Sequence, residues 1–267
     1  INNQSFHAFV NPLDFNDPNS VKIINNWIAG NTKQKITDAL DKIDPTDLMF
    51  LINAIYFKGV WQYRFDKNAT ANNNFYLGNN ATVSTPFMSL HQTLKYFKND
   101  SIQIAELPYG NGNNFNMYII LPDNNIPVSA LAASIDNESF SYWKSNLYLA
   151  DLQIYLPKFQ YKYSIQDMKP ELTAMGMGIA FSSSADFSKM YNVPVAISKA
   201  IHKTYIEVNE EGTEAAAVTV IGIEESMSPA PPQPIVMNVD HPFLYVIQEK
   251  SSGAILFLGI VNNPATE

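Results

Sequence analysis

Apolar positions follow a helical rhythm early in the chain. Between residues 20 and 40 they recur at three- and four-residue spacing, at Ile23, Ile24, Trp27 and Ile28. This spacing predicts a helix over "SVKIINNWIAGNTKQKITDAL", and Asp17 or Asn19 precedes it as a candidate cap. Two shorter helices are predicted at "IPVSALAASID" and "SIQDMKPELTAMGM".

Most of the other apolar residues fall into strand patterns. "DLMFLINAIYFKGVW" is a near-continuous apolar run, which is typical of a strand covered on both faces. "FNMYIILP" and "LYLADLQIYLPKF" predict further strands, the second with alternation at Leu152, Ile154 and Leu156. The last apolar stretch, "HPFLYVIQEKSSGAILFLGIVNNP", predicts a β-hairpin around a Lys-Ser-Ser-Gly turn. With no internal repeat and no flexible linker, the pattern predicts one α+β domain with large, mainly antiparallel sheets.

Composition narrows the classes of partner. The 267 residues are 46% apolar and carry a formal net charge of −8. An acidic chain with no basic stripe argues against a nucleic-acid partner and against an anionic membrane surface. There is no cysteine, so a disulfide framework and a thiolate zinc site are both excluded. No apolar run reaches the roughly 18–20 residues that a membrane-spanning helix requires.

The residues that could carry catalysis form no recognisable set. No Gly-x-Ser-x-Gly or His-x-x-x-His pattern occurs. His202 lies in the strand-like "AISKAIHKTYIEV", where we expect a buried, hydrogen-bonded structural histidine. An acidic cluster could suggest paired carboxylates or a cation site, but a solvated strand end is the favoured interpretation; its members are Glu207, Glu210, Glu211 and Glu214. We therefore expect no enzyme activity, no catalytic residue, no metal and no cofactor.

One stretch, residues 209–234, combines a strand pattern with a proline barrier. From Thr213 to Ile223 one alternating set of side chains is small or apolar and could face a core. Gly212 precedes it as a possible hinge, because glycine accepts backbone angles that other residues avoid. Eleven extended residues would span about 35 Å, and the four prolines after Glu225 would stop any sheet from continuing. The pattern fits a segment able to slide into a sheet, and it fits equally an edge strand followed by a proline-rich loop.

Several motifs, in order, resemble those of the serpins, the serine-protease-inhibitor fold. "NEEGTEAAA" resembles the hinge of their reactive-centre loop. "DLMFLINAIYFKGVWQYRF" resembles the third strand of their main sheet, with Asn53 and Trp61 at the usual Asn and Trp. "AISKAIHKTYIEVNEEGTEAA" resembles the fifth strand running into the hinge, with His202 at the usual histidine. Further matching motifs are "LPKF", "AFSSSADFSKM", "DHPFLYVI" and "GAILFLGIVNNP".

The resemblance implies inhibition of serine endopeptidases, with cysteine endopeptidases as a second class, by a suicide-substrate mechanism. The target attacks the exposed loop, and the cut hinge then inserts into the main sheet as an extra strand. The hinge residues would be Glu211, Gly212, Thr213, Glu214, Ala215, Ala216 and Ala217. Counting from the hinge places the cut between Ser226 and Met227, within a window from Ile223 to Ser228. This bond favours an elastase-like or subtilisin-like protease, whereas a cut at Glu224 or Glu225 would indicate a glutamate-selective one.

The resemblance also carries expectations about organisation. Residues 1–267 would form one serpin domain, with 209–234 as hinge and reactive-centre loop. Relative to the family, the amino-terminal helices and one central sheet strand are missing, so we expect a gap in the main sheet. We expect a monomer that is secreted or extracellular, or periplasmic or on the cell surface if the source is bacterial. Two alternatives remain: a non-inhibitory serpin acting as a binding or carrier protein, and a surface module that presents "SMSPAPPQP" to a groove.

Overall fold

A computed structural model describes residues 8–78, 81–112, 114–213 and 233–266. The chain divides into two compact units. Unit 1 comprises Ile1–Tyr56 and Lys162–Tyr205, and unit 2 comprises Phe57–Tyr161 and Ile206–Glu267. Each unit therefore combines two segments that are distant in the sequence, and residues from the two segments contact each other within the unit.

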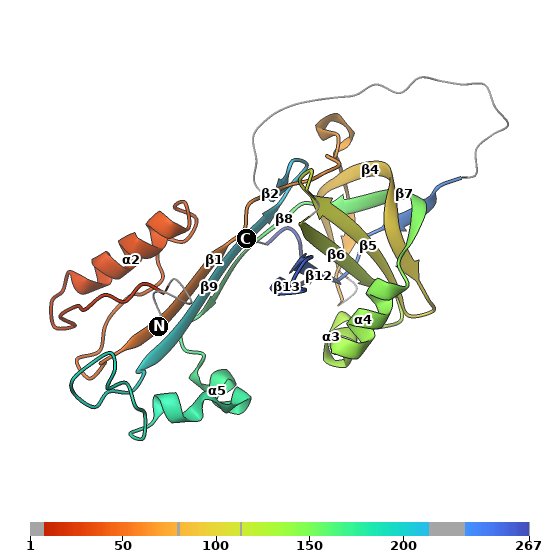
Figure 1. Ribbon diagram of the computed structural model, residues 1–267. Helices are drawn as coiled ribbons and strands as arrows, with labels where there is room; N and C mark the ends of the chain where they lie inside the picture. Colours follow the sequence, from red (N-terminus) through yellow and green to blue (C-terminus); the bar gives the residue numbers. More distant parts are fainter. Residues whose placement is uncertain (1–7, 79–80, 113, 214–232, 267) are drawn as a thin grey trace. The chain divides into compact units, whose positions relative to one another are not determined.

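Unit 1 is built on a three-stranded sheet in the order β1-β9-β8. The strands are β1 (Phe50–Tyr56), β8 (Phe159–Ile165) and β9 (Lys199–Val208). β1 and β9 run parallel, and their register places Asn53 opposite His202. The helix α2 (Ser20–Asn31) lies along one face of this sheet (Figure 1), where Ile24 and Ile28 pack with Ile201 and Tyr205.

The other face of β1 is open among the described residues, so the prediction of a strand covered on both faces is wrong. Phe50 and Ile52 pack against the cluster under α2, but Leu51 on the opposite face is 43% exposed. An apolar run shows that both faces of a strand can be buried. It does not show which layer covers each face, and α2 covers only one.

The helices of unit 1 are shorter than their patterns predict. α2 ends at Asn31, because Lys33 and Gln34 have φ angles of 52° and 63°, which no helix continues through. Asn19 is the cap residue but its side chain makes no capping bond. The helix predicted at 164–177 is only partly formed. Residues 169–181 contain three short helical segments, α5 (Lys169–Leu172), η2 (Thr173–Met177) and η3 (Gly178–Phe181). Gly176, with φ 98°, interrupts the helical backbone within η2.

Unit 2 is built on an eight-stranded, mainly antiparallel sheet, as its strand patterns predict. Seven strands follow the order β11-β7-β4-β5-β6-β12-β13, and β3 pairs with β4. Their bounds are β3 (Ala71–Tyr76), β4 (Thr82–Lys98), β5 (Ile102–Tyr109), β6 (Phe115–Pro122), β7 (Tyr148–Pro157), β11 (Ile235–Asn238), β12 (Phe243–Glu249) and β13 (Ile255–Val261). The alternating Leu152, Ile154 and Leu156 are fully buried, and the terminal hairpin forms with Gly253 at φ 73° in its turn.

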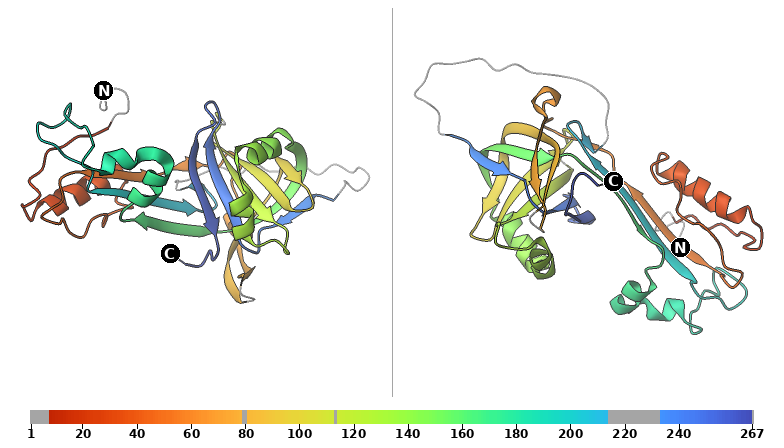
Figure 2. Two further views of the ribbon diagram at one scale, coloured as in Figure 1. Left: turned by 90° about the horizontal axis from the view of Figure 1, so that it is seen from below. Right: turned by 180° about the vertical axis from the view of Figure 1, so that it is seen from behind.

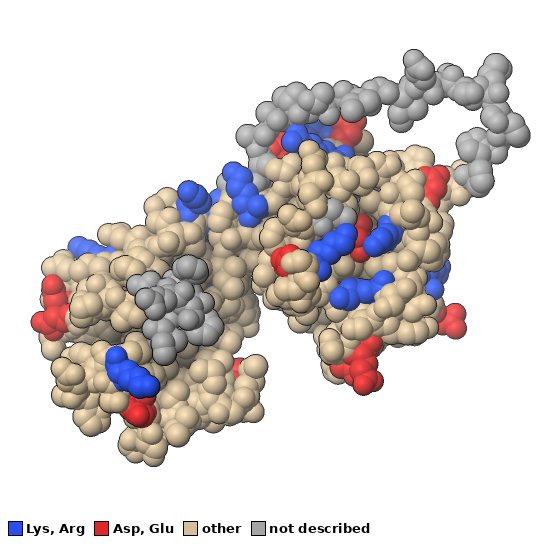
Figure 3. Space-filling view, in the orientation of Figure 1, with Lys and Arg blue, Asp and Glu red and all other residues tan. Residues whose placement is uncertain are grey.

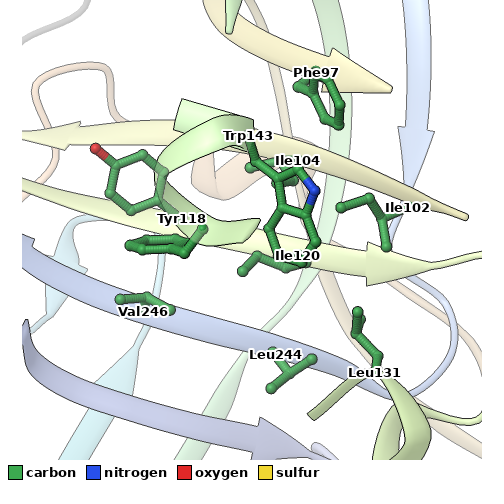
Figure 4. Packing of buried hydrophobic residues seen from close by; sticks show 10 residues of the cluster. Phe97, Ile102, Ile104, Tyr118, Ile120, Leu131, Trp143, Leu244 and Val246 are labelled. Atoms are coloured by element: carbon green, nitrogen blue, oxygen red, sulfur yellow. The ribbon is translucent and has the colours of Figure 1, made fainter. Parts of the chain in front are cut away.

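Two helices close one side of this sheet, α3 (Val128–Ser134), at its predicted place, and α4 (Asn137–Ser145). Both lie beside β5 and β6 in each view of Figures 1 and 2. Figure 4 shows Trp143 of α4 lying over Ile104 and Ile120, with Leu131 of α3 and Leu244 of β12 close by. This cluster is the hydrophobic core of that side of unit 2.

Three short elements of unit 2 lie where the chain leaves β9. They are β2 (Gly59–Val60), η1 (Lys67–Ala69) and β10 (Gly212–Thr213). β2 and β10 pair antiparallel, with Gly212 opposite Val60 and Thr213 opposite Gly59. Together they bring the start of the hinge motif against residues 59–70.

Candidate functional site

The candidate site is the segment from Asn209 to Thr213, in which β9 turns into the hinge. Asn209 and Gly212 exchange two backbone hydrogen bonds of 3.0 and 3.2 Å, which close a tight turn. Gly212 has φ 141°, and a Cβ atom there would lie 2.1 Å from the carbonyl oxygen of Gly59. Both the backbone angle and this close approach require glycine, as the sequence predicts for the hinge.

Residues 59–62 hold this segment from the side. The N–H of Trp61 donates to the carbonyl of Glu211 at 3.0 Å. The N–H of Gln62 donates to Pro108 at 2.8 Å, and the N–H of Gly110 donates to Val60 at 2.7 Å. The stretch is therefore bonded to the end of β5 on one side and to the hinge on the other.

Thr213, the first small residue of the hinge, is inside the protein. It is 1% exposed, and its Oγ1 lies 2.8 Å from the hydroxyl of Tyr109. Burial raises the pKa of Tyr109 far above its ordinary value, so this phenol is neutral across the physiological range. The two buried hydroxyls satisfy each other with a neutral hydrogen bond.

Trp61 contacts both Tyr109 and the turn. Its indole ring stacks on Tyr109, with centroids 4.4 Å apart and an interplanar angle of 14°. Its indole N–H donates to the carbonyl oxygen of Asn209 at 2.8 Å. Trp61 therefore connects the start of the turn at Asn209 with the tyrosine that contacts its end.

Glu210 is buried and paired, so the expectation of a solvated strand end is wrong for it. Its carboxylate lies 3.0 Å from Nζ of Lys158 and accepts a 2.8 Å hydrogen bond from the Thr70 hydroxyl. Burial alone would raise the pKa of Glu210, but hydrogen bonds from its own backbone, from Lys158 and from Thr70 lower it overall. The residue is 6% exposed and ionised at neutral pH.

Glu211 is also held in place. It forms an ion pair with Lys67 of η1, and its side chain is 15% exposed. Its Oε2 is buried and has no hydrogen-bond partner among the described residues. The two acidic residues therefore fix the turn to η1 and its cap residue, and Glu210 also fixes it to Lys158 between β7 and β8.

Asn53 and His202, which resemble structural residues of the serpin sheet, lie in unit 1. They are direct register partners on β1 and β9. Asn53 is exposed, whereas His202 is half-buried and burial lowers its pKa. His202 is therefore less buried than its strand pattern predicts, and it is neutral at physiological pH.

Several of the expected site residues lie outside the described part of the chain. They are Glu214, Ala215, Ala216, Ala217, Ser226 and Met227. Among the residues that the structure does describe, no group of three or more His, Cys, Asp or Glu could hold a metal ion. No helix in that part of the chain is long and apolar enough to cross a membrane.

No sequence pattern identifies the residues that hold the hinge segment in place, namely Tyr109, Lys158, Thr70 and Lys67. Lys158 stands in the "LPKF" motif, which carries part of the family resemblance. Tyr109 ends a strand pattern and gives no other signal, because its role depends on a partner 104 residues away. Only the fold brings it to Thr213.

Comparison with known proteins decides the family. The family model described as "Serpin (serine protease inhibitor)" matches residues 1–264. The chain belongs to the serpin family. Its α+β architecture is that of the serpins, and membership supports protease inhibition in general terms.

Individual serpins match at moderate identity. The chain is 36% identical to Serpin-Z1C of Triticum aestivum over 253 residues, which is 90% of this chain and 63% of that protein. It is 36% identical to Iripin-2 of Ixodes ricinus, over 97% of this chain and 65% of the relative. The chain thus spans somewhat less than two thirds of the length of these relatives.

Solved structures match closely in fold. Thyroxine-binding globulin in complex with thyroxine has a TM-score of 0.87 at 26% identity, over 99% of this chain and 70% of that one. The thermophilic serpin Tengpin in its native state has a TM-score of 0.82 at 31% identity, over 92% of this chain and 64% of that one. One of these two structures thus contains thyroxine, and the other is described only as a serpin in its native state.

Proposed function

We propose that the protein inhibits serine endopeptidases as a suicide substrate, by inserting its cut hinge into the sheet of unit 1. The observation that supports this most directly is the state of Thr213. It is already in a strand and buried, and the four residues that follow it are Glu, Ala, Ala and Ala. Small side chains can pass between existing strands, whereas bulky ones would collide with them.

The parallel pair β1 and β9 is the place for the new strand. These strands resemble the third and fifth of the serpin sheet, and they pair directly along seven register positions. The inserted hinge would separate them and bond to both. Insertion would break the parallel β1–β9 ladder and form two new ladders, one with each strand. The net gain of one ladder, together with the burial of the inserted side chains, is the source of the stabilisation.

The chemistry belongs to the protease. Its serine attacks the carbonyl carbon of the residue before the cut, the peptide bond breaks, and the new amino terminus leaves. An ester then joins the protease to the residue before the cut, which the hinge precedes in the chain. Insertion of the hinge displaces the bound protease and distorts its active site before water hydrolyses this ester, so the complex persists.

The scissile bond of this proposal is Ser226–Met227, with Ile223 to Ser228 as the window. A small residue or methionine immediately before the cut suits an elastase-like or subtilisin-like protease. The protein would act as a monomer outside the cell, where it would meet such proteases. It needs no cofactor, because the protease supplies the nucleophile.

The test is exposure of the complete natural polypeptide to elastase, subtilisin, chymotrypsin and trypsin types. We expect an SDS-stable covalent complex with at least one of them, and intact-mass analysis of the released fragment to locate the cut. Thr213→Arg should convert the inhibitor to a substrate, since a long charged side chain cannot enter the sheet. Trapping by this variant at the wild-type level would show that insertion at the hinge is not the mechanism.

A non-inhibitory carrier is the second candidate, favoured by one feature of unit 2. A groove of about 400 Å³ is lined by Lys95, Glu106, Asn116, Lys144 and Lys250, among others. Oδ1 of Asn116 is buried there without a partner among the described residues. Figure 3 shows basic side chains gathered on the visible face of this unit. A carrier would be cleaved in its loop without forming a covalent complex, so the protease panel separates the two functions.

A further inference from the structure

The strand-like part of the hinge, from Thr213 onward, begins with a residue that already occupies a buried position in the uncut protein. Thr213 pairs with Gly59 of β2 and is 1% exposed. Its hydroxyl lies 2.8 Å from that of Tyr109, which is 4% exposed. Neither hydroxyl can turn to water, so each depends on the other for its hydrogen bond.

The surroundings fix Tyr109 in this position. Its ring stacks on Trp61 at 4.4 Å and meets the edge of Phe57 at 5.0 Å. A ring held between two aromatic neighbours has few positions open to its hydroxyl. The oxygen is therefore a fixed point, and Thr213 is placed against it.

We propose that Tyr109 is a positioning residue for inhibition, whose hydroxyl seats Thr213 so that insertion starts from a buried and aligned first residue. The inference rests on the proposed function and adds to it a residue on which the speed of insertion depends. Insertion competes with hydrolysis of the ester that joins the protease to the residue before the cut. A hinge whose first residue is already seated has lost part of its conformational freedom before cleavage, and it enters the sheet sooner.

Because the two buried hydroxyls depend on each other, removing one should have a different effect from removing both. Removing one hydroxyl leaves the other buried without a partner, which destabilises the seated position. Removing both leaves two apolar groups of nearly the same shape, which can be close to neutral. The single variants should therefore be impaired, and the double variant should recover.

The experiment compares Tyr109→Phe, Thr213→Val and the double variant in the complete natural polypeptide. One measurement is the number of inhibitor molecules consumed for each protease molecule trapped, with a protease that the wild type traps. The other is amide hydrogen exchange at residues 211–213 in the uncut protein, which needs no protease. Tyr96→Phe is the matched control, because Tyr96 is 1% exposed and its hydroxyl donates to Gln103 at 2.7 Å, in a different part of the sheet.

We expect each single variant to raise the consumption at least about fivefold and to speed exchange at the hinge, because each strands one buried hydroxyl. The double variant should return to within about twofold of the wild type, and Tyr96→Phe should match the wild type in both measurements. Single variants that trap protease as efficiently as the wild type, or a double variant as impaired as the two singles combined, would overturn the inference. Failure of the wild type to trap any protease would instead overturn the proposed function itself.

Discussion

At the scale of single residues, the acidic side chains near the hinge differ most from what the sequence pattern predicts. Glu207, Glu210, Glu211 and Glu214 form one cluster in the sequence. In the structure, Glu210 is 6% exposed and contacts Lys158 and Thr70, while Glu211 contacts Lys67. A charged residue is rarely buried without a partner. Here the partners stand 52, 140 and 144 residues earlier in the chain.

Glu210→Gln should lower the free energy of unfolding by about 1–3 kcal/mol at neutral pH, because Lys158 loses a buried charge partner. Urea unfolding measures the change, and the exposed Glu138→Gln is the control, expected within about 0.5 kcal/mol of the wild type. The folded-state pKa of Glu210 is lowered from 4.5, so its contribution is present above the unfolded-state pKa and is lost as the pH falls through the folded-state value. The gap between wild type and variant should therefore shrink below about pH 4. An equal gap at pH 3 and pH 7 would contradict the assignment.

His241 should make unit 2 less stable at alkaline pH. Its Nδ1 lies 2.9 Å from a carboxylate oxygen of Asp240 and its Nε2 lies 2.9 Å from the carbonyl oxygen of Pro122. Burial lowers the pKa of His241, but the hydrogen bonds to Asp240 and Pro122 raise it by more than burial lowers it, so the net direction is upward. A group with a raised folded-state pKa stabilises the fold fully below the unfolded-state value, and this is lost as the pH rises through the folded-state value.

The measurement is the midpoint of thermal unfolding at about pH 6 and at about pH 9, on either side of the ordinary histidine pKa of about 6.5. The wild type should lose more stability than His241→Gln between these two conditions. Equal losses in the two proteins would show that His241 is not the titrating group.

At the scale of elements, the rhythm of apolar positions predicts strands well and helix ends poorly. The predicted strands at "FNMYIILP" and "LYLADLQIYLPKF" correspond to β6 and β7, and the terminal hairpin forms as β12 and β13. The helix predicted over residues 20–40 ends at Asn31. Periodicity describes the apolar face of a helix, but the residues that end it act through local backbone angles, here at Lys33 and Gln34.

The cluster under α3 and α4 should be sensitive to truncation. Ile120 is fully buried in it, so Ile120→Ala should lower the free energy of unfolding by about 2–5 kcal/mol and Ile120→Val by about 0.5–1.5 kcal/mol. Leu149→Ala is the control, because Leu149 is 71% exposed, and it should change stability by less than about 0.5 kcal/mol. Denaturant unfolding gives all three values. A similar cost for Ile120→Ala and Leu149→Ala would contradict this placement of the core.

At the scale of the whole molecule, the proposed mechanism requires an uncut state that is held away from a more stable form by a kinetic barrier. In unit 1 the strands β1 and β9 pair directly, so the position between them that the new strand would take is closed. In unit 2 the described part of the hinge ends at Thr213, which is paired in β10. Cleavage would free the rest of the hinge to complete the sheet.

Cleavage in the loop should therefore raise the melting temperature of the complete natural polypeptide. Each additional kcal/mol of stability corresponds to about 2–4 °C for a domain of this size, so a rise of more than about 4 °C is expected once a full strand is added. Calorimetry of the nicked and the intact protein measures it. A nicked Thr213→Arg variant should show no such rise. A nicked wild type that melted at or below the temperature of the intact protein would exclude insertion.

The sequence by itself determined the strand rhythm of the two larger sheets, the presence of a possible hinge glycine at position 212 and the run of small residues after it. These features depend on neighbouring residues along the chain, so they can be recognised without the fold. The tertiary structure alone decided that Thr213 meets Tyr109, that Glu210 is buried against Lys158, and that one face of β1 is open among the described residues. Each of these depends on which distant segment is brought alongside, and strand pairing and packing set that arrangement rather than any local pattern.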